Sequence, residues 1–364
     1  MNNELKAYFI IVSTIIGLGI FALPYVFWYS GFYFIFWLFF LTLIFFILHL
    51  IFGEILLQTK EKHNLPGLVE IYIHPKFKHL VWFFDYFGML GTFLIYFIVL
   101  AQFWFLIINI NPLFIKLIFA LFNLYFIFKN LNIFTKMESI LTILIFITFF
   151  SLISFMIPKI NLENINFAFK NNLEPFLPYG VILFAISGLS SLPLVLDLIG
   201  RDKNKYFKVN FYALLTIFLF YIIYTFVTIG FIGEKISEES LKSLSPFLPK
   251  WFLIIAVILV TLNITFVDMA FYLKRGLIYD YKLSPNLANI ILFFSILPLV
   301  FFEPFSLIKL ISLVSEIFLG FNMLIICLIY LKLKDKIYFK FSNYLIWSLI
   351  LIFLFGIIYG LLQK

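Results

Sequence analysis

The chain has 364 residues, of which 64% are hydrophobic and only 12% are charged. A soluble domain is about 45–50% apolar and about 25% charged, so this composition excludes the soluble classes and indicates an integral membrane protein. The net charge of +8 does not indicate a nucleic-acid partner, because the lysines and arginines lie in short clusters between apolar runs. The single cysteine, Cys327, lies in an apolar run and predicts neither a disulfide nor a metal site.

Apolar runs of about 20 residues mark the expected membrane spans. We predict eleven spans, at residues 7–29, 32–57, 82–108, 112–128, 138–157, 176–199, 208–231, 249–272, 287–302, 305–330 and 341–361. Basic loops follow the even-numbered spans, whereas the loops after the fifth and seventh spans are acidic. The positive-inside rule then predicts a multi-pass protein of the cell membrane, with a cytoplasmic amino terminus and an extracellular carboxyl terminus.

The first span contains Gly17, Gly19 and Pro24 within an otherwise apolar run. A membrane helix normally pairs its backbone N–H and C=O groups internally, and glycines followed by a proline loosen that pairing. Freed backbone groups are tolerated at this depth only where they face protein or a water-filled cavity. We therefore predict that the first helix is broken and that the break binds something small and charged.

The sixth span repeats this pattern, since Gly188 and Pro193 are five residues apart, as are Gly19 and Pro24. Paired Gly/Pro-interrupted spans in two halves of a chain indicate a transporter built from inverted repeats. The alternative is that both glycine clusters are ordinary packing faces between membrane helices.

The predicted fold is an all-α integral membrane protein with 11 transmembrane helices. It has a 5+5 inverted repeat, broken helices 1 and 6, and one extra helix. Residues 1–364 are expected to form a single transporter domain. Its first repeat would lie at about 7–157, its second at about 176–330 and the extra helix at about 341–361.

The run Gly17-x-Gly19-Ile20-x-Ala22-Leu23-Pro24-Tyr25 resembles the first-helix signature of the amino acid/auxin permease family. Ser187-Gly188-x-Ser190-x-x-Pro193 resembles the sixth-helix break of this family, and Gly91–Tyr96 is similar to its third helix. The resemblance covers the whole chain and is close to the aromatic amino acid permeases of the amino acid-polyamine-organocation superfamily. The chain departs from those permeases at Ser187, where a histidine is usual.

The resemblance implies that an amino acid binds between the two breaks. Half-helix N-termini with unpaired N–H groups suit its carboxylate, whereas unwound carbonyls suit its ammonium group. The residues implied to bind substrate are Ile15, Gly17, Leu18, Gly19, Tyr96, Phe184, Ala185, Ser187 and Gly188. Tyr96 is expected either to donate to the substrate carboxylate or to bond a carbonyl of a neighbouring helix.

The eighth span carries Thr261, Thr265 and Asp268 on one helical face. In the resembling fold a cation lies between the first helix and hydroxyl groups of the eighth. The carbonyls of Ser13 and Ile16 with Thr261 or Thr265 are therefore expected to bind Na⁺. The alternative is that each threonine hydroxyl bonds back to its own helix.

Glu316 lies near the middle of the tenth span. A buried carboxylate is costly in a membrane, so Glu316 is the first candidate for a proton-coupling group. The alternative is a static pair with Lys309 or with a cation of another helix.

Asp197 and Asp268 lie towards the inner ends of the sixth and eighth spans. We expect them to act in gating, through salt bridges to Arg201 or Lys274.

The sequence contains no nucleotide-binding loop and no catalytic constellation, so neither an enzyme nor an ATP-driven pump is expected. We expect a secondary active amino acid transporter in the lipid bilayer, without a resident cofactor, coupled to H⁺ or Na⁺ by symport and working by alternating access. Small residues at the sixth break beside Phe184 favour a large apolar or aromatic substrate. The rivals are a carrier of another solute, such as a nucleobase, polyamine or metal ion, and a non-transporting membrane sensor or enzyme.

Overall fold

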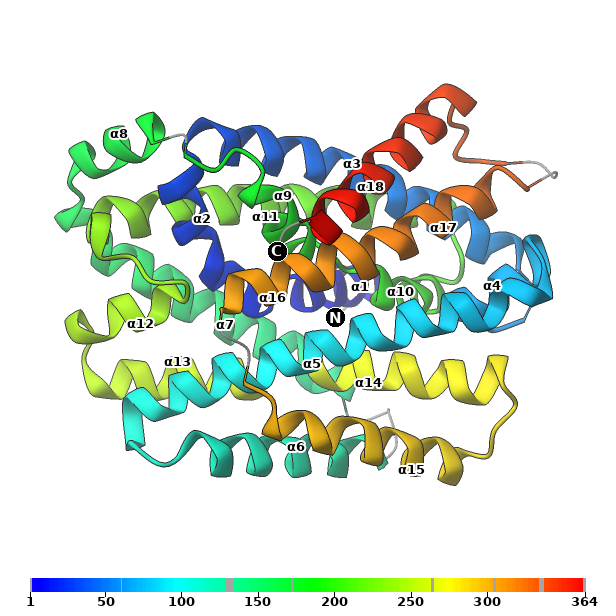
Figure 1. Cartoon of the computed structure of the whole chain (residues 1–364), viewed down its shortest axis with the longest axis horizontal. Helices are drawn as coiled ribbons and strands as arrows, with labels where there is room; N and C mark the ends of the chain where they lie inside the picture. The colour runs from blue at the N-terminus through cyan, green and yellow to red at the C-terminus, as the bar shows by residue number, and fades with distance from the viewer. Residues whose placement is uncertain are drawn as a thin grey trace.

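The computed structural model describes residues 2–59, 61–128, 134–171, 173–262, 265–303, 306–333 and 337–362. Within these ranges the side chains of residues 126, 134–138 and 265–268 are outside the description. Every regular element in the described ranges is helical, which confirms the predicted all-α class. Figure 1 shows most of the long helices running lengthwise in a bundle, with α8 and α12 at its left end and α4 at its right end.

Long apolar stretches form helices that continue without a break. They are α3 (Phe32–Gln58), α5 (Lys78–Ile108), α6 (Pro112–Phe128), α7 (Phe134–Met156), α11 (Lys203–Ile232) and α18 (Asn343–Leu362). The shorter membrane-region helices are α13 (Lys250–Leu262), α14 (Thr265–Arg275) with η8 (Gly276–Asp280), and α15 (Pro285–Ile296) with η9 (Leu297–Phe301).

Three segments change helix type along their length. They are α1 (Asn3–Ile15), η1 (Leu18–Ala22) and α2 (Leu23–Ser30); α9 (Leu177–Ala185), η5 (Leu189–Ser191) and α10 (Leu192–Leu198); and α16 (Leu307–Leu313), η10 (Val314–Leu319) and α17 (Gly320–Tyr330). The first two contain the glycine–proline patterns of the sequence, so the prediction of broken helices 1 and 6 is confirmed.

Short helices connect the long ones at the two ends of the bundle. They are α4 (Leu65–Tyr72), η2 (Pro75–Phe77), η4 (Ile157–Lys159), α8 (Leu162–Lys170), η6 (Gly233–Lys235), α12 (Ser240–Leu244) and η7 (Ser245–Phe247).

Seven described helices are long and apolar enough to cross a membrane, or eight if the bent pair Asn3–Ile15 and Leu18–Ser30 forms one span. Three shorter apolar helices, Pro112–Tyr125, Lys250–Leu262 and Pro285–Phe301, lie at positions where we predicted further spans. The chain is therefore a multi-pass membrane protein. The count of eleven spans, the inverted repeat and the orientation of the termini stay predictions.

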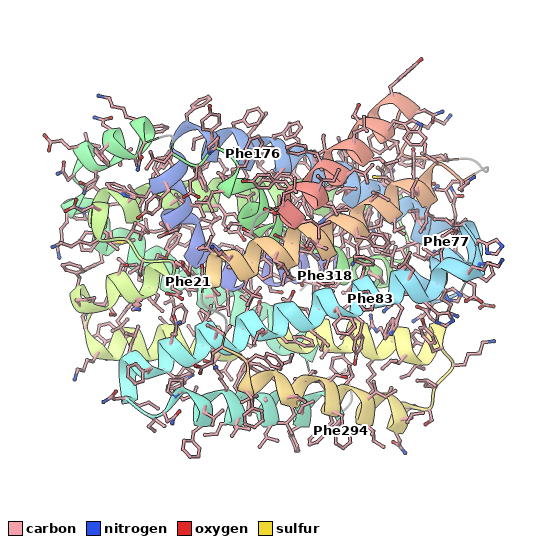
Figure 2. All side chains as sticks on the ribbon, in the orientation of Figure 1. Phe21, Phe77, Phe83, Phe176, Phe294 and Phe318 are labelled. Carbon is pink, nitrogen blue, oxygen red and sulfur yellow. The ribbon has the colours of Figure 1, made fainter. Side chains whose placement is uncertain are left out.

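Large apolar side chains cover the outside of the bundle as well as its core. Phe294 is 70% exposed and Phe83 is 49% exposed, whereas Phe21 is only 4% exposed. Figure 2 shows Phe294 at the edge of the bundle, on the outer helix α15. Exposed apolar surface of this extent is unfavourable in water but is what lipid chains solvate, so the exposed phenylalanines mark the lipid-facing surface.

The two broken helices lie inside this bundle. Helix α1 packs against α11, α7 and α10, and α9 packs against α3, α16 and η10. Because other helices enclose both breaks, their unpaired backbone groups are sheltered from lipid, as a membrane requires.

Candidate functional site

The first break begins where α1 stops at Ile15. Ile16 N–H still donates to the Val12 carbonyl at 2.8 Å, but η1 starts only at Leu18. The segments before and after the break are bent by 46°. The first N–H groups of a new helix have no partner within it, so the N–H groups of Leu18 and Gly19 face the break without helical pairing.

The second break follows Ala185, the last residue of α9. Gly188 separates it from η5, and Pro193 lies in the first turn of α10, where its missing N–H is not needed. A Cβ atom on Gly188 would lie 2.6 Å from Ile15 Cγ1, and one on Gly19 would lie 2.9 Å from Ala185 Cα. The two breaks therefore touch each other, and only glycine fits at the contact.

A pocket of about 50 Å³ lies where the breaks meet. The residues that line it are Thr14, Ile15, Gly17, Leu18, Gly19, Met89, Thr92, Tyr96, Phe184, Ala185, Ser187, Ser190, Met269 and Leu319. The structure thus brings together every predicted substrate-binding residue except Gly188, which instead allows Ile15 to approach. That they bind substrate stays a prediction.

Several lining residues were missed by the sequence analysis. Met89 and Thr92 precede Tyr96 by seven and four residues on α5, which places all three on one helical face. Their spacing from Tyr96 could have predicted that Met89 and Thr92 line the same site. Met269 and Leu319 carried no such signal, because their arrival at the pocket depends on how α14 and η10 pack.

The chemistry of the lining is apolar with a few hydroxyl groups. Among the described lining residues none is charged, whereas Met89, Met269, Leu319 and Phe184 supply apolar walls. Methionine is flexible and adapts to irregular shapes. The site therefore offers backbone dipoles for charged groups of a ligand and an adaptable apolar surface for its remainder.

Tyr221 on α11 joins the two breaks from outside the pocket, and the sequence analysis missed it. Its hydroxyl lies 2.7 Å from the Ala185 carbonyl oxygen and 3.0 Å from the Ile15 carbonyl oxygen. Tyr221 is fully buried and does not line the pocket. The end of α1 and the end of α9 thus share one buried hydroxyl.

The structure does not bring the Thr261 hydroxyl to Ser13 and Ile16. The prediction that Thr261 is a Na⁺ ligand is therefore wrong. The Thr261 hydroxyl donates to the Val257 carbonyl at 2.6 Å and accepts from Trp104 Nε1 at 3.0 Å. It faces an apolar groove between α5, α6 and α13. The alternative of a bond back to its own helix is what the structure has. The side chains of Thr265 and Asp268 lie outside the described residues.

Glu316 lies in η10, a π-helical turn of the kind that often marks a functional site. It is 1% exposed, and neither carboxylate oxygen has a hydrogen-bond partner within the described part of the chain. The carboxylate fits between two glycines, since a Cβ on Gly180 would meet Oε1 at 2.3 Å and one on Gly360 would meet Oε2 at 2.8 Å. The alternative partner Lys309 is exposed on α16. An acid this buried, against one half of a broken helix, is a functional candidate.

A polar vestibule of about 540 Å³ opens at the end of the bundle that carries the basic loops. Asp197 lines it and pairs with Lys62 at 3.3 Å, so the predicted pairing with Arg201 is wrong. Arg201 instead donates to the carbonyls of Leu56 and Thr59 at the end of α3. Lys274 donates to the Ile127 carbonyl at 3.0 Å.

A cluster of aromatic rings packs beside the first break. Phe21 lies two residues beyond Gly19, with its ring centroid 5.0 Å from that of Phe103 and 5.7 Å from that of Phe149. Phe103 is two turns beyond Tyr96 on α5. Phe21 belongs to η1, which also contacts α12, whereas the vestibule lies at the end of the bundle that carries the basic loops.

The loop that carries α12 is fastened to the start of α16. Glu238 accepts hydrogen bonds from the Ser306 hydroxyl and the Leu307 N–H, both at 2.9 Å, and from the Ile308 N–H at 3.3 Å. It thereby satisfies orphan N–H groups of α16 and places a negative charge at the positive end of that helix. Next to it, burial raises the pKa of Glu239 above its usual range.

The comparisons agree with this geometry. The family model described as amino acid permease matches residues 3–280, and no curated protein matches the chain. A mutant of the Eremococcus coleocola manganese transporter has a similar structure, with a TM-score of 0.67 at 12% identity, covering 99% of this chain and 85% of that one. MhsT in complex with L-phenylalanine has a TM-score of 0.59 at 14% identity, covering 98% of each chain. These two structures show the fold alone, whereas the family match spans most of the chain. The protein is therefore a membrane transporter that belongs to the amino acid permease family.

Proposed function

We propose that the protein is a secondary active amino acid transporter that works by cation-coupled symport and alternating access. The observation that carries this proposal is the contact of the two breaks at one pocket, where the N–H end of η1 and the carbonyl ends of α1 and α9 converge. An amino acid carries one carboxylate and one ammonium group, and these backbone ends match both.

Within this function, we propose a large apolar or aromatic substrate. Support comes from the apolar walls of Met89, Met269, Leu319 and Phe184. The pocket volume of about 50 Å³ holds only a few water molecules, so such a side chain requires the surrounding helices to separate. Methionines adapt to a new occupant more easily than branched side chains do.

We further propose that the coupling ion is H⁺ and that Glu316 carries it. Neither carboxylate oxygen has a hydrogen-bond partner among the described residues, and Oε1 lies against Gly180 of α9 while Oε2 lies against Gly360 of α18. Protonation of the carboxyl group therefore changes the cost of keeping both helices packed on η10. The Thr261 contacts exclude one of the two threonines that the sequence pattern offered as a Na⁺ ligand, whereas the side chain of the other, Thr265, lies outside the described residues.

Manganese transporters share the fold, which makes a metal carrier the rival with most support. Their likeness at about 12% identity does not extend to the cargo. Among the described side chains that line the pocket there are hydroxyls and thioethers but no carboxylate or imidazole. Mn²⁺ prefers oxygen ligands such as carboxylates, so the lining favours an amino acid over this cargo.

The test is uptake by proteoliposomes across a panel of amino acids, with Na⁺ and pH gradients imposed separately. We expect saturable accumulation of phenylalanine, tryptophan or leucine under an inward proton gradient without Na⁺. Equal or better uptake of glutamate, lysine or glycine would contradict the substrate class. Uptake that requires Na⁺ and ignores the pH gradient would contradict proton coupling, and uptake of Mn²⁺ alone would favour the rival.

Alternating access predicts that Glu238 holds the α12 side of the transporter closed. Glu238→Ala removes the cap of α16, and loss of a cap costs about 1 kcal/mol. We expect roughly a five- to tenfold rise in the fraction open on that side, since about 1.4 kcal/mol is a factor of ten. The measurement is labelling of a cysteine at Thr92, in a Cys327→Ser background, by an impermeant reagent supplied to the α12 side. Glu234→Ala, an exposed acid of the same loop, is the control and should leave labelling unchanged.

A further inference from the structure

Tyr221 marks the point where the ends of two broken helices meet a third helix. Its hydroxyl oxygen is 2.7 Å from the carbonyl oxygen of Ala185 and 3.0 Å from that of Ile15. Ala185 is the last residue of α9 and Ile15 is the last residue of α1. A side chain of α11 therefore links the two helix ends that the sequence analysis assigned to opposite halves of the chain.

The junction has more acceptors than protons. A tyrosine hydroxyl donates one hydrogen bond. The Ile15 carbonyl already accepts a hydrogen bond from the Gly17 N–H at 2.8 Å. The Tyr221 hydroxyl therefore donates to the nearer carbonyl, that of Ala185. Two carbonyl oxygens thus lie within hydrogen-bond distance of a hydroxyl group that has one proton. Each helix C-terminus also carries about half a negative charge, so the junction attracts a positive group with several N–H donors.

The residues that carry these carbonyls also line the pocket. Ile15 and Ala185 line the pocket, whereas Tyr221 is 0% exposed and is not part of the lining. A carbonyl oxygen has two lone pairs, so the bond from Tyr221 to the Ala185 carbonyl leaves one lone pair for a ligand. None of the described lining residues is charged, so among them nothing but the ligand supplies a positive charge at these carbonyls.

We propose that Tyr221 is a positioning residue for the ammonium group of the substrate. It holds the carbonyl ends of α1 and α9 at the spacing that a primary ammonium group bridges, and it thereby selects substrates that carry a free ammonium group. This inference rests on the proposed amino acid transport and names the residue that sets recognition at the ammonium end of the site.

The experiment compares ligands that differ only in the ammonium group. The pairs are L-phenylalanine with 3-phenylpropanoate and L-leucine with 4-methylpentanoate, measured by binding to the purified full-length protein. In Tyr221→Phe we expect about a tenfold loss of affinity for the amino acid, since one bond that orders the carbonyls is gone. Affinity for the matching carboxylic acid should stay unchanged, because that ligand never contacts the carbonyls.

The matched control is Tyr206→Phe. Tyr206 is also on α11, is also fully buried, and donates its hydroxyl to the His49 carbonyl at 2.7 Å. It should leave the affinity for both members of each pair unchanged. A parallel loss for the amino acid and the acid in Tyr221→Phe would mean a merely structural role and would overturn the proposal, as would unchanged affinity for both.

A second measurement uses the wild-type protein and does not depend on whether the variant folds. N-methyl- and N,N-dimethyl-L-phenylalanine lose one and two N–H donors, so each step should weaken binding. Equal affinity along this series would overturn the proposal. If the wild type binds no amino acid of the panel, the proposed function itself fails, which differs from a failure confined to Tyr221→Phe.

Discussion

Replacing Gly19 by valine should abolish uptake while the protein still inserts into the membrane. A Cβ at this position would lie 2.9 Å from Ala185 Cα and 3.1 Å from Ala185 Cβ, and it would also meet the Phe184 ring at 3.2 Å. Backbone atoms cannot move aside as the end of a flexible side chain can. Overpacking costs about 1–3 kcal/mol, so substrate affinity should fall about tenfold to a hundredfold. Proteoliposome uptake and ligand binding measure the effect.

The control for Gly19→Val is a glycine with room around it. A Cβ on Gly320 would meet Ile357 Cγ1 at 3.4 Å and two carbonyl oxygens at 3.8 and 3.9 Å, which are ordinary contacts. Gly320→Ala should therefore insert and transport like the wild type. Normal uptake by Gly19→Val, or normal affinity, would show that the two breaks do not have to touch for the site to form.

Glu316→Gln should remove accumulation driven by a pH gradient and leave exchange of substrate for substrate intact. An amide cannot take up and release a proton, but it keeps the shape of the carboxyl group between Gly180 and Gly360. For symport of one proton, a gradient of about one pH unit supports an accumulation ratio of up to about ten. In Glu316→Gln we expect this ratio to fall to about one. Counterflow of labelled amino acid measures the exchange that remains.

Glu54→Gln is the matched control for Glu316→Gln. Glu54 is also fully buried, but its carboxylate accepts hydrogen bonds from the Phe339 N–H at 3.1 Å and from Gln58 Nε2 at 2.9 Å. A carboxylate held in this way has a structural role, so its amide should accumulate substrate like the wild type. Unchanged accumulation in Glu316→Gln would reassign coupling to another group.

Much of the candidate site could be predicted because it is made of local backbone. Gly17, Gly19 and Gly188 with two prolines disturb helical hydrogen bonding whatever packs around them, and the structure breaks both helices at these positions. The residues beside the breaks line the pocket for the same reason. Tyr96 was placed by resemblance, and its helical spacing from Met89 and Thr92 could have extended the prediction along α5.

The sequence by itself determined the membrane class, the helical content and the broken helices, because hydrophobicity and backbone propensity act over a few neighbouring residues. The tertiary structure alone decided which side chains meet across the bundle. Tyr221 and Ile15 are 206 residues apart, and their contact depends on the rotation of α11 against α1. Thr261 faces Trp104 rather than the first break, and Glu316 of η10 lies against Gly180 of α9. A helix rotates or shifts register at little cost until its neighbours pack against it, so no periodicity read along one chain fixes these contacts.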